Sequence, residues 1–391
     1  MLNIRNFIHY IKYNFNIILV GFLFFILSKP YFAWNTSIGS ICCIFFILWG
    51  AISIKKSDFK IAVLAVLFMI LSFVNASISN LNFSGIIISV FFPFLFFITP
   101  EKRIRILESF KNIYIIFIFF SLLIFLSVYI LRINIPYTQI QSLNVLKDYN
   151  YKVYPFLAMP NISFLLLPRF PALYDEPGVV GSISILLLIT FNKELNKFSY
   201  IVILLSGILS FSLFFYITFI LYIATVNFKR VLFVLLTIAA FVIIFPPIHD
   251  YYDNYINSRL EIDSSGSLAG DNRTTENFDK EYSVFLNSSF LLFGKGESPI
   301  ASGSSSYKTI IYTRGLIFFI LTFSLFTFYA ISKLKNIHSL YIFIIYFVGM
   351  TYQRPFYFDP FYFFMFLTMV DYLQLKDNHN NTKSHKHVLS N

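Results

Sequence analysis

Charged residues are scarce in this chain. Only 13% of the 391 residues are Asp, Glu, Lys or Arg, whereas 57% are hydrophobic and 52 are phenylalanine. Soluble proteins usually carry roughly a quarter of charged residues. A water-soluble protein could not bury so much apolar surface, so the solvent around this chain must be lipid. The composition therefore excludes a cytosolic enzyme and a disordered chain.

Cysteine and the common catalytic motifs are also nearly absent. The two cysteines, Cys42 and Cys43, are adjacent within an apolar run, which excludes a framework of disulfides. The sequence holds no His-Glu-x-x-His, Cys-x-x-Cys or Gly-x-Ser-x-Gly motif and no Walker-type loop. These absences argue against a metal site, a thiol redox site, a serine hydrolase and an ATPase, and we expect no cofactor.

Apolar runs recur along the whole chain, and most have the length of a membrane helix once ragged ends are allowed. The sequence therefore predicts an all-α polytopic membrane protein with about 12 transmembrane helices. The runs cover residues 15–28, 36–54, 61–76, 84–99, 109–131, 178–191, 200–226, 231–247, 312–331, 339–350 and 358–372.

The run 200–226 can be one long span or two short ones, because Gly207 and the polar break Ser210-Phe211-Ser212 interrupt it. If it crosses twice, the two long polar loops face the same side and nearly all short basic clusters face the cytoplasm. Only Lys29 and Arg354 then fall in short outer loops, as the positive-inside rule favours. We therefore expect two crossings here and both termini in the cytoplasm.

The predicted order of segments follows from this topology. Two long periplasmic loops separate three groups of helices, and the polar tail after the last run is expected to be unfolded. The segments are residues 1–131 (N-terminal helices), 132–177 (first loop), 178–247 (central helices), 248–311 (large loop), 312–372 (C-terminal helices) and 373–391 (cytoplasmic tail).

The first long loop ends in a short polar stretch directly before a span. Arg169 and Glu176 are seven residues apart, and Tyr174 and Asp175 lie between them. A carboxylate at the lipid edge can act as a general base toward a sugar hydroxyl. The alternative is an interfacial ion pair that ends a helix, with Pro177 in the first turn.

The large loop and its borders carry further arginines. Arg259 and Arg273 could clamp a phosphate, because a guanidinium matches phosphate with two parallel hydrogen bonds. Arg314 opens the next span and Arg354 lies between the last two spans. Each of these two side chains either snorkels to the headgroups or faces a cavity. A loop of this length favours a lid or a binding surface over an idle connection.

The apolar runs themselves hold no Asp, Glu, Lys or Arg in mid-run with an evident partner. Ion-coupled transporters usually place such groups near the middle of the membrane. Their absence favours a function at the outer membrane–water boundary over transport.

Four segments in this order resemble the O-antigen polymerase and ligase superfamily. They are an Arg-x₆-Glu-Pro stretch, a serine-containing break between two short spans, a loop segment with Arg and Phe-Gly-x-Gly, and a return to the membrane that ends in x-Gly. The matching residues are 169–181, 209–221, 272–296 and 306–319.

The resemblance implies a metal-independent membrane glycosyltransferase of the bacterial inner membrane. It would transfer a growing glycan from undecaprenyl diphosphate to a lipid-linked repeat unit at the periplasmic face. The resemblance also raises a chain-length regulator protein as a candidate partner, and it implies no nucleic acid. The ligase branch usually carries a histidine before the following span, where this chain reads Ser302-Gly303-Ser304-Ser305-Ser306-Tyr307. That departure favours a polymerase over a ligase.

In this reading Glu176 orients or deprotonates the attacking sugar hydroxyl, and Arg169 and Arg273 stabilise the leaving diphosphate. The expected substrate-binding residues are Arg259, Arg314, Arg354, Tyr174 and Asp175. Two alternatives stay open, an O-antigen ligase and a flippase for the same lipid-linked oligosaccharide.

Overall fold

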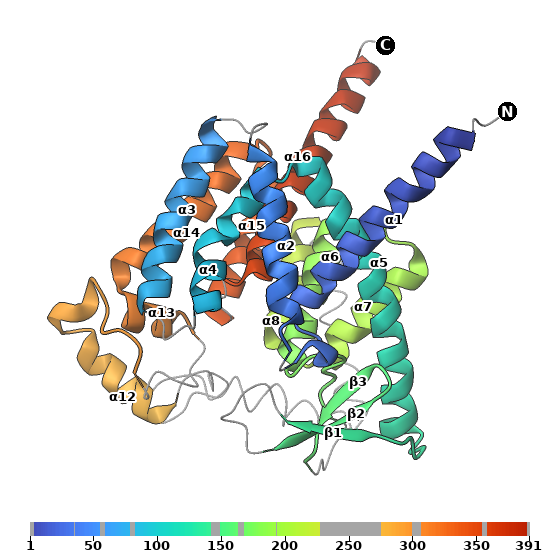
Figure 1. Ribbon diagram of the computed structural model, residues 1–391, viewed down its shortest axis with the longest axis horizontal. Helices are drawn as coiled ribbons and strands as arrows, with labels where there is room; N and C mark the ends of the chain where they lie inside the picture. Colours follow the sequence, from blue (N-terminus) through green and yellow to red (C-terminus); the bar gives the residue numbers. More distant parts are fainter. Residues whose placement is uncertain are drawn as a thin grey trace. The chain divides into compact units, whose positions relative to one another are not determined.

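The computed structural model describes residues 4–34, 36–54, 59–78, 83–141, 149–162, 168–192, 194–226, 275–298, 306–353 and 358–388. The described chain is mostly helical, as Figure 1 shows. It forms two compact units. The first contains Met1–Phe117, Ile317–Phe343 and Phe356–Asn391, and the second contains Ile118–Leu316 and Ile344–Pro355.

The first unit is a helical bundle. Within it, α3 packs against α4, and the 3₁₀ segment η3 that follows α4 packs against α2 and α3. α5 and α15 begin in this unit and end in the second one. The elements are α1 (Ile4–Leu27), η1 (Tyr31–Ala33), α2 (Ile38–Ile52), α3 (Phe59–Ile78), α4 (Phe83–Phe91), η3 (Phe92–Phe97), α5 (Pro100–Phe125), α14 (Leu316–Lys333), α15 (Ile337–Gln353) and α16 (Pro360–Val388).

Phenylalanine rings form the interior of the first unit. Phe24 of α1 lies 4.6 Å from Phe364 of α16, measured between ring centroids. Phe68 of α3 meets Phe326 of α14 edge to face at 4.8 Å, and Phe363 of α16 meets Phe92 in the same way at 4.7 Å. Tilted and edge-on contacts of this kind add to the stabilisation from burial alone. The abundance of phenylalanine thus supplies the helix packing of this unit.

Within the described part of the chain, three helices are long and apolar enough to cross a membrane, namely Phe59–Ser77, Pro100–Ile130 and Leu316–Lys333. Their outward side chains are apolar as well: Phe73 is 60% exposed and Phe328 is 61% exposed. The other apolar helices are shorter, and a helix of 15 residues spans only about 22 Å against a hydrocarbon core of about 30 Å. The prediction of twelve crossings is therefore not confirmed, although apolar helices that could span a membrane are present.

The central helices of the second unit are α6 (Pro177–Phe191), α7 (Lys197–Leu209) and α8 (Leu213–Val226). The break at residues 210–212 is present as a tight turn, in which Phe211 adopts a positive φ of 45°. Gly207 lets the chain turn so sharply, since a Cβ there would lie 2.1 Å from the ring of Phe215. The run 200–226 therefore contains two helices joined by a turn, as two crossings require, and the crossings themselves stay a prediction.

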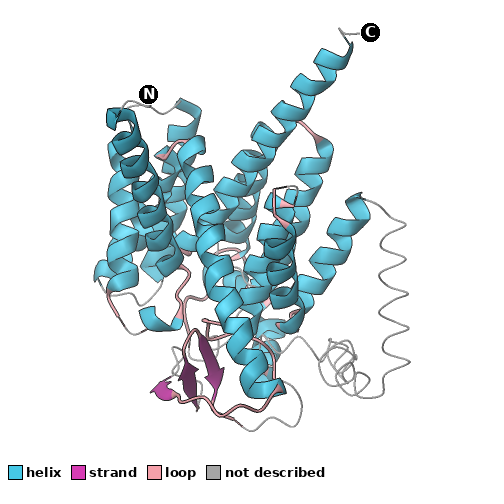
Figure 2. Cartoon of the chain, turned by 90° about the vertical axis from the view of Figure 1, so that its right-hand side faces the viewer, coloured by secondary structure: helices cyan, strands magenta, loops and turns pink. Residues whose placement is uncertain are grey.

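The first long loop contains a small sheet, which corrects the all-α prediction. β1 (Thr138–Gln141), β2 (Asn150–Tyr154) and β3 (Leu157–Pro160) are antiparallel neighbours in that order, and Figure 2 shows them in magenta. Thr138 pairs with Val153, and Tyr151 pairs with Pro160. The sequence did not predict these strands because they are only four or five residues long. An isolated strand of this length carries little periodic signal.

A buried group of charges joins three helices of the first unit, at or beyond the ends of the predicted apolar runs. Arg103 of α5 pairs with Asp371 of α16 at 2.8 Å, and their side chains are 1% and 0% exposed. The hydroxyl of Tyr329 in α14 accepts a hydrogen bond from Arg103 at 3.3 Å and donates one to Asp371 at 3.1 Å. Arg103 lies in one of the short basic clusters that the positive-inside rule assigns to the cytoplasmic side.

The polar tail is helical rather than unfolded. α16 continues from the apolar run through the tail to Val388. No glycine or proline follows Pro360, so nothing in the sequence interrupts the helix once it has started. The predicted run 231–247 lies outside the described residues.

Candidate functional site

The stretch that links β3 to α6 is packed against the break between α7 and α8. Arg169 donates through Nε to the backbone carbonyl of Ser210 at 3.1 Å, and the backbone N–H of Phe170 donates to the carbonyl of Leu209 at 2.8 Å. Phe170 is fully buried and meets Phe125 edge to face at 5.2 Å. Two segments of the predicted motif order, 169–181 and 209–221, are thus in direct contact.

Small residues make this contact close. A Cβ on Gly181 of α6 would lie 2.6 Å from Cβ of Ser212 and 3.0 Å from Oγ of Ser210. Deeper in the same helix pair, Ser184 and Ser206 share a hydrogen bond of 2.9 Å. The hydroxyl of Ser212 is buried and has no hydrogen-bond partner within the described part of the chain. A buried polar group without a partner is costly and often marks a functional position.

The sheet supports this stretch from its other side. The N–H of Ala158 in β3 donates to the carbonyl of Ala172 at 2.8 Å, and the hydroxyl of Tyr151 in β2 donates to the carbonyl of Asp175 at 2.6 Å. Burial raises the pKa of Tyr151, so its hydroxyl keeps the proton that it donates. Ala172 adopts a positive φ of 51°, which a residue other than glycine holds only under external constraint.

Glu176 occupies the N-cap position of α6, and Pro177 begins the first turn, as the sequence predicts. The carboxylate therefore lies at the positive end of the helix dipole, which stabilises its charged form. Tyr174 is 1% exposed, so its ring is packed in the interior. Asp175 and Glu176 are partly exposed and lie beside Tyr151 and the start of α6. The chemical roles of these residues and of Arg169 stay predictions.

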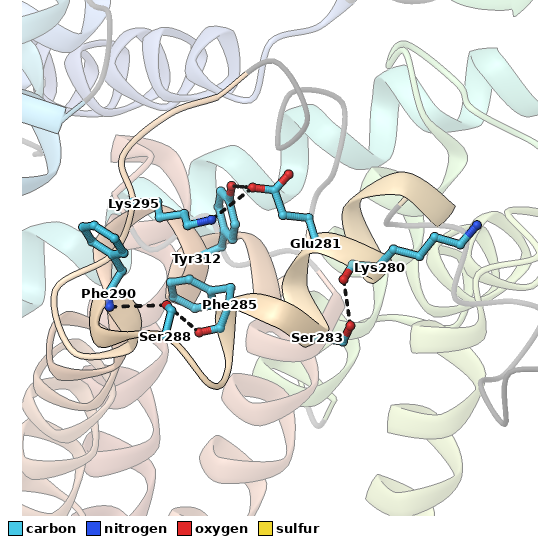
Figure 3. Close-up of polar contacts among 8 residues, drawn as sticks. All are labelled: Lys280, Glu281, Ser283, Phe285, Ser288, Phe290, Lys295 and Tyr312. Carbon is cyan, nitrogen blue, oxygen red and sulfur yellow. Dashed lines mark hydrogen bonds and ion pairs between the residues drawn. The ribbon is translucent and has the colours of Figure 1, made fainter.

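A second polar group joins α12 (Glu276–Phe285) to α13 (Tyr307–Arg314). Figure 3 shows Tyr312 donating a hydrogen bond to the carboxylate of Glu281, which Lys295 also approaches at 3.3 Å. Lys295 Nζ lies 5.6 Å above the ring of Tyr312. A further ion pair joins Lys308 to Asp279 at 2.9 Å. The pKa of Glu281 is lowered, chiefly by the hydrogen bond from Tyr312 and also by Lys295.

The Phe-Gly-x-Gly turn is hydrogen-bonded through its backbone to α13, which holds Lys295 next to Tyr312. The N–H groups of Lys295 and Gly296 donate to the carbonyls of Tyr312 at 2.8 Å and Thr313 at 3.0 Å. Gly294 and Gly296 have φ near +83° and +82°, which favours glycine. A Cβ on Gly294 would lie 2.5 Å from the carbonyl oxygen of Thr313. Position 294 therefore requires glycine for both conformation and space, and position 296 requires it for conformation alone.

Arg314 closes α13 and is the only predicted arginine of this region within the described residues. Its side chain is 14% exposed, with Glu297 at 3.7 Å and a hydrogen bond of 2.7 Å to Thr313. Burial lowers the pKa of Arg314, and the Glu297 carboxylate opposes that shift. A guanidinium remains protonated at neutral pH in either case. Arg314 is thus a partly desolvated cation at the end of the helix that precedes α14.

The structure brings the predicted residues together in two pairs of segments. One pair contains Arg169 and Glu176, and the other contains Arg314. None of the contacts described above joins the two pairs. Arg259, Arg273 and Arg354 lie outside the described residues.

Sequence reasoning missed Glu281 and Tyr312, which meet across 31 positions of the chain. The Phe-Gly-x-Gly motif was the one sequence feature that pointed to this contact. Two glycines in a turn indicate that the backbone packs closely against another segment, which here is α13. The described residues include no group of three or more His, Cys, Asp or Glu side chains with the arrangement of a metal site.

Comparisons with protein-family models, with curated proteins and with solved structures give no match for this chain.

Proposed function

We propose that this chain is a polysaccharide polymerase of the bacterial inner membrane that acts at the periplasmic face. It transfers a growing glycan from undecaprenyl diphosphate to a lipid-linked repeat unit, without a metal. About 12 crossings with both termini in the cytoplasm are part of the proposal. The observation that carries it is the hydrogen bond from Arg169 to the Ser210 carbonyl, because it joins two segments of the resemblance.

Arg169 and Glu176 have the chemistry that this transfer needs. The bond between the anomeric carbon and the diphosphate oxygen breaks while the acceptor hydroxyl oxygen bonds to that carbon. The diphosphate gains negative charge, which a positioned guanidinium stabilises. The proton of the acceptor hydroxyl passes to Glu176. The bond through Nε of Arg169 fixes the plane of its guanidinium, and Glu176 stands at the N-cap position of α6, at the positive end of the helix dipole.

Strain and close packing support the choice of this segment. Ala172 and Phe211 both adopt positive φ on the two contacting stretches, at 51° and 45°. Such conformations are uncommon for these residue types and gather at functional sites. In the proposal Arg273 stabilises the diphosphate with Arg169, while Arg259, Arg314, Arg354 and Asp175 bind substrate. The predicted contact of Tyr174 with substrate is not part of the proposal, because its ring is buried.

A flippase for the same lipid-linked oligosaccharide is the second candidate function. The Arg103–Asp371 pair favours it, because a buried ion pair between helices is a feature of transport pathways. Arg103 lies in the first turn of α5, however, and Tyr329, which bonds to both members of the pair, lies towards the end of α14, whereas coupled transporters place such groups near the midplane. The polymerase therefore remains the better supported function.

The test uses the purified chain in phospholipid vesicles with an undecaprenyl-diphosphate-linked oligosaccharide. We expect a ladder of extended glycans that forms equally well with EDTA. Arg169→Ala should lower the rate of extension by about 100-fold or more, as loss of a transition-state donor does. Arg132→Ala is the matched control, because Arg132 is exposed on the same unit and outside the motif.

Three results would overturn the proposal. They are normal extension by Arg169→Ala, transfer of the glycan only onto a lipid A core, and movement of the lipid-linked oligosaccharide across the bilayer without extension. The second result would assign a ligase and the third a flippase.

A further inference from the structure

An apolar surface lies exposed at the end of α12 and on the turn that follows it. Its members are all large and at least 45% exposed, whereas Phe278 and Phe285 of the same helix are fully buried. We call this surface the 284–293 apolar patch. It consists of Val284 (68% exposed), Leu286 (45%), Phe290 (52%), Leu292 (48%) and Phe293 (72%).

The patch is held in a defined conformation. Ser288 donates to the carbonyl of Phe285 at 2.8 Å and accepts from the N–H of Phe290 at 3.3 Å. The N–H of Gly294 donates to the carbonyl of Phe290 at 2.7 Å. Figure 3 shows that Phe290 points away from the Glu281–Tyr312 contact, while Lys280 extends on the far side of α12. Phe290 of the patch therefore lies apart from the polar contact between Glu281 and Tyr312.

Backbone contacts fix the patch beside the start of α14. A Cβ on Gly315 would lie 2.2 Å from the carbonyl oxygen of Leu292 and 2.5 Å from the carbonyl carbon of Phe293. Gly315 directly precedes Leu316, where α14 begins. α14 is one of the helices that are long and apolar enough to cross a membrane. The patch thus contacts the residue directly before the start of this helix.

Three acidic residues of this region are paired with basic side chains, which weakens their repulsion of anionic lipid headgroups. Asp279 is paired with Lys308, Glu281 with Lys295, and Glu297 with Arg314. Pairing reduces the repulsion between carboxylates and anionic phospholipids. The transfer of exposed phenylalanine and leucine side chains from water to the acyl-chain boundary lowers the free energy of the system.

We propose that the 284–293 apolar patch inserts into the interfacial layer of the bilayer, on the same side as the start of α14. The patch acts as an anchor that keeps α12, α13 and the Arg314–Glu297 pair at the depth of the headgroups. The anchor depends on α14 crossing the membrane and does not depend on the polymerase activity.

The test is a depth measurement with a spin label on single cysteines. Phe293→Cys reports on the patch, and Ser283→Cys is the control because it is exposed on the same helix and hydrogen-bonded to the carbonyl of Lys280. The natural cysteines, Cys42 and Cys43, are buried, so the unsubstituted chain gives the background labelling. The protein is reconstituted into vesicles of phosphatidylethanolamine and phosphatidylglycerol.

We expect the label at position 293 to collide with dissolved oxygen and to be shielded from a water-soluble nickel chelate, and the label at position 283 to behave in the opposite way. Equal access of the nickel chelate to both positions would place the patch in water and overturn the proposal. Shielding of position 293 from both reagents would mean that protein covers it, which also overturns the proposal. Phe290→Cys replaces Phe293→Cys if that variant does not fold.

Discussion

Two triads of the same chemistry lie in two different environments. Arg103, Tyr329 and Asp371 form a cation–phenol–carboxylate group in the first unit, and Lys295, Tyr312 and Glu281 form another in the second. The charged side chains of the first triad are at most 1% exposed, whereas those of the second are 31% and 27% exposed. The first triad can hold helices together only as a complete set, because an unpaired charge there has no water to solvate it. The second can exchange its partners for water or for a ligand at little cost.

The largest effect is expected from breaking the buried triad on one side. Arg103→Met leaves the Asp371 carboxylate without its cation, and this should lower the free energy of unfolding by about 3–5 kcal/mol. The check is thermal or denaturant unfolding of the purified chain in one detergent, followed by a signal from the helices.

The matched control is the double variant Arg103→Met with Asp371→Leu. It removes both charges and keeps similar side-chain volumes. It should recover most of the free energy of unfolding that Arg103→Met loses, because well-packed apolar residues often replace a buried ion pair without lowering stability. If the double variant is less stable than Arg103→Met alone, the triad does not behave as a coupled buried pair.

The next effect tests what holds the exposed triad in place. Gly294→Ala adds a Cβ 2.5 Å from the Thr313 carbonyl oxygen at a φ of +83°, and it should cost about 1–3 kcal/mol in local stability. Gly296→Ala has the same sign of φ but meets nothing within 4 Å, so it should cost about 1 kcal/mol.

The measurement is hydrogen exchange at the amides of Lys295 and Gly296, which donate to α13. Faster exchange in Gly294→Ala than in Gly296→Ala supports a turn held by backbone packing. Equal exchange in the two variants would show that conformation alone, and not the contact with Thr313, makes glycine necessary.

A smaller effect is expected from removing a charge of the exposed triad. Lys295→Ala should change the local stability by less than about 1 kcal/mol, since exposed ion pairs contribute little and are screened by salt. The same amide exchange, compared at low and high salt, checks this. An effect as large as that of Arg103→Met would remove the contrast between the two triads.

The sequence predicted the parts of this molecule that rest on local pattern. The helix break at Ser210–Ser212 and the start of α6 at Pro177 follow from residue types whose conformational preferences act over a few positions. Hydropathy likewise indicated apolar helices, although it could not fix how many of them cross a membrane.

The parts that the sequence did not predict depend on contacts between distant positions. Hydropathy does not predict the pair of Arg103 and Asp371, because it averages over a window and ignores partners across the fold. The contact between Glu281 and Tyr312 spans a polar segment without periodic signal. The pairing of β1 with β2 escaped notice because its strands are short. In each case the deciding term is tertiary packing, which no local pattern carries.

The smallest effect is the pH dependence of the exposed triad. The pKa of Glu281 is lowered from its ordinary value of 4.5 by Tyr312 and Lys295, so the folded state binds its proton less readily than the unfolded state. The resulting stabilisation is fully present above pH 4.5 and is lost as the pH falls through the lowered value. Exchange at the Lys295 and Gly296 amides, corrected for its intrinsic pH dependence, should therefore accelerate only below about pH 4.5. Glu281→Gln should remove this step while leaving the exchange of α6 unchanged. A step that persists in Glu281→Gln would assign the titration to another carboxylate and would separate the triad from the acid sensitivity of this region.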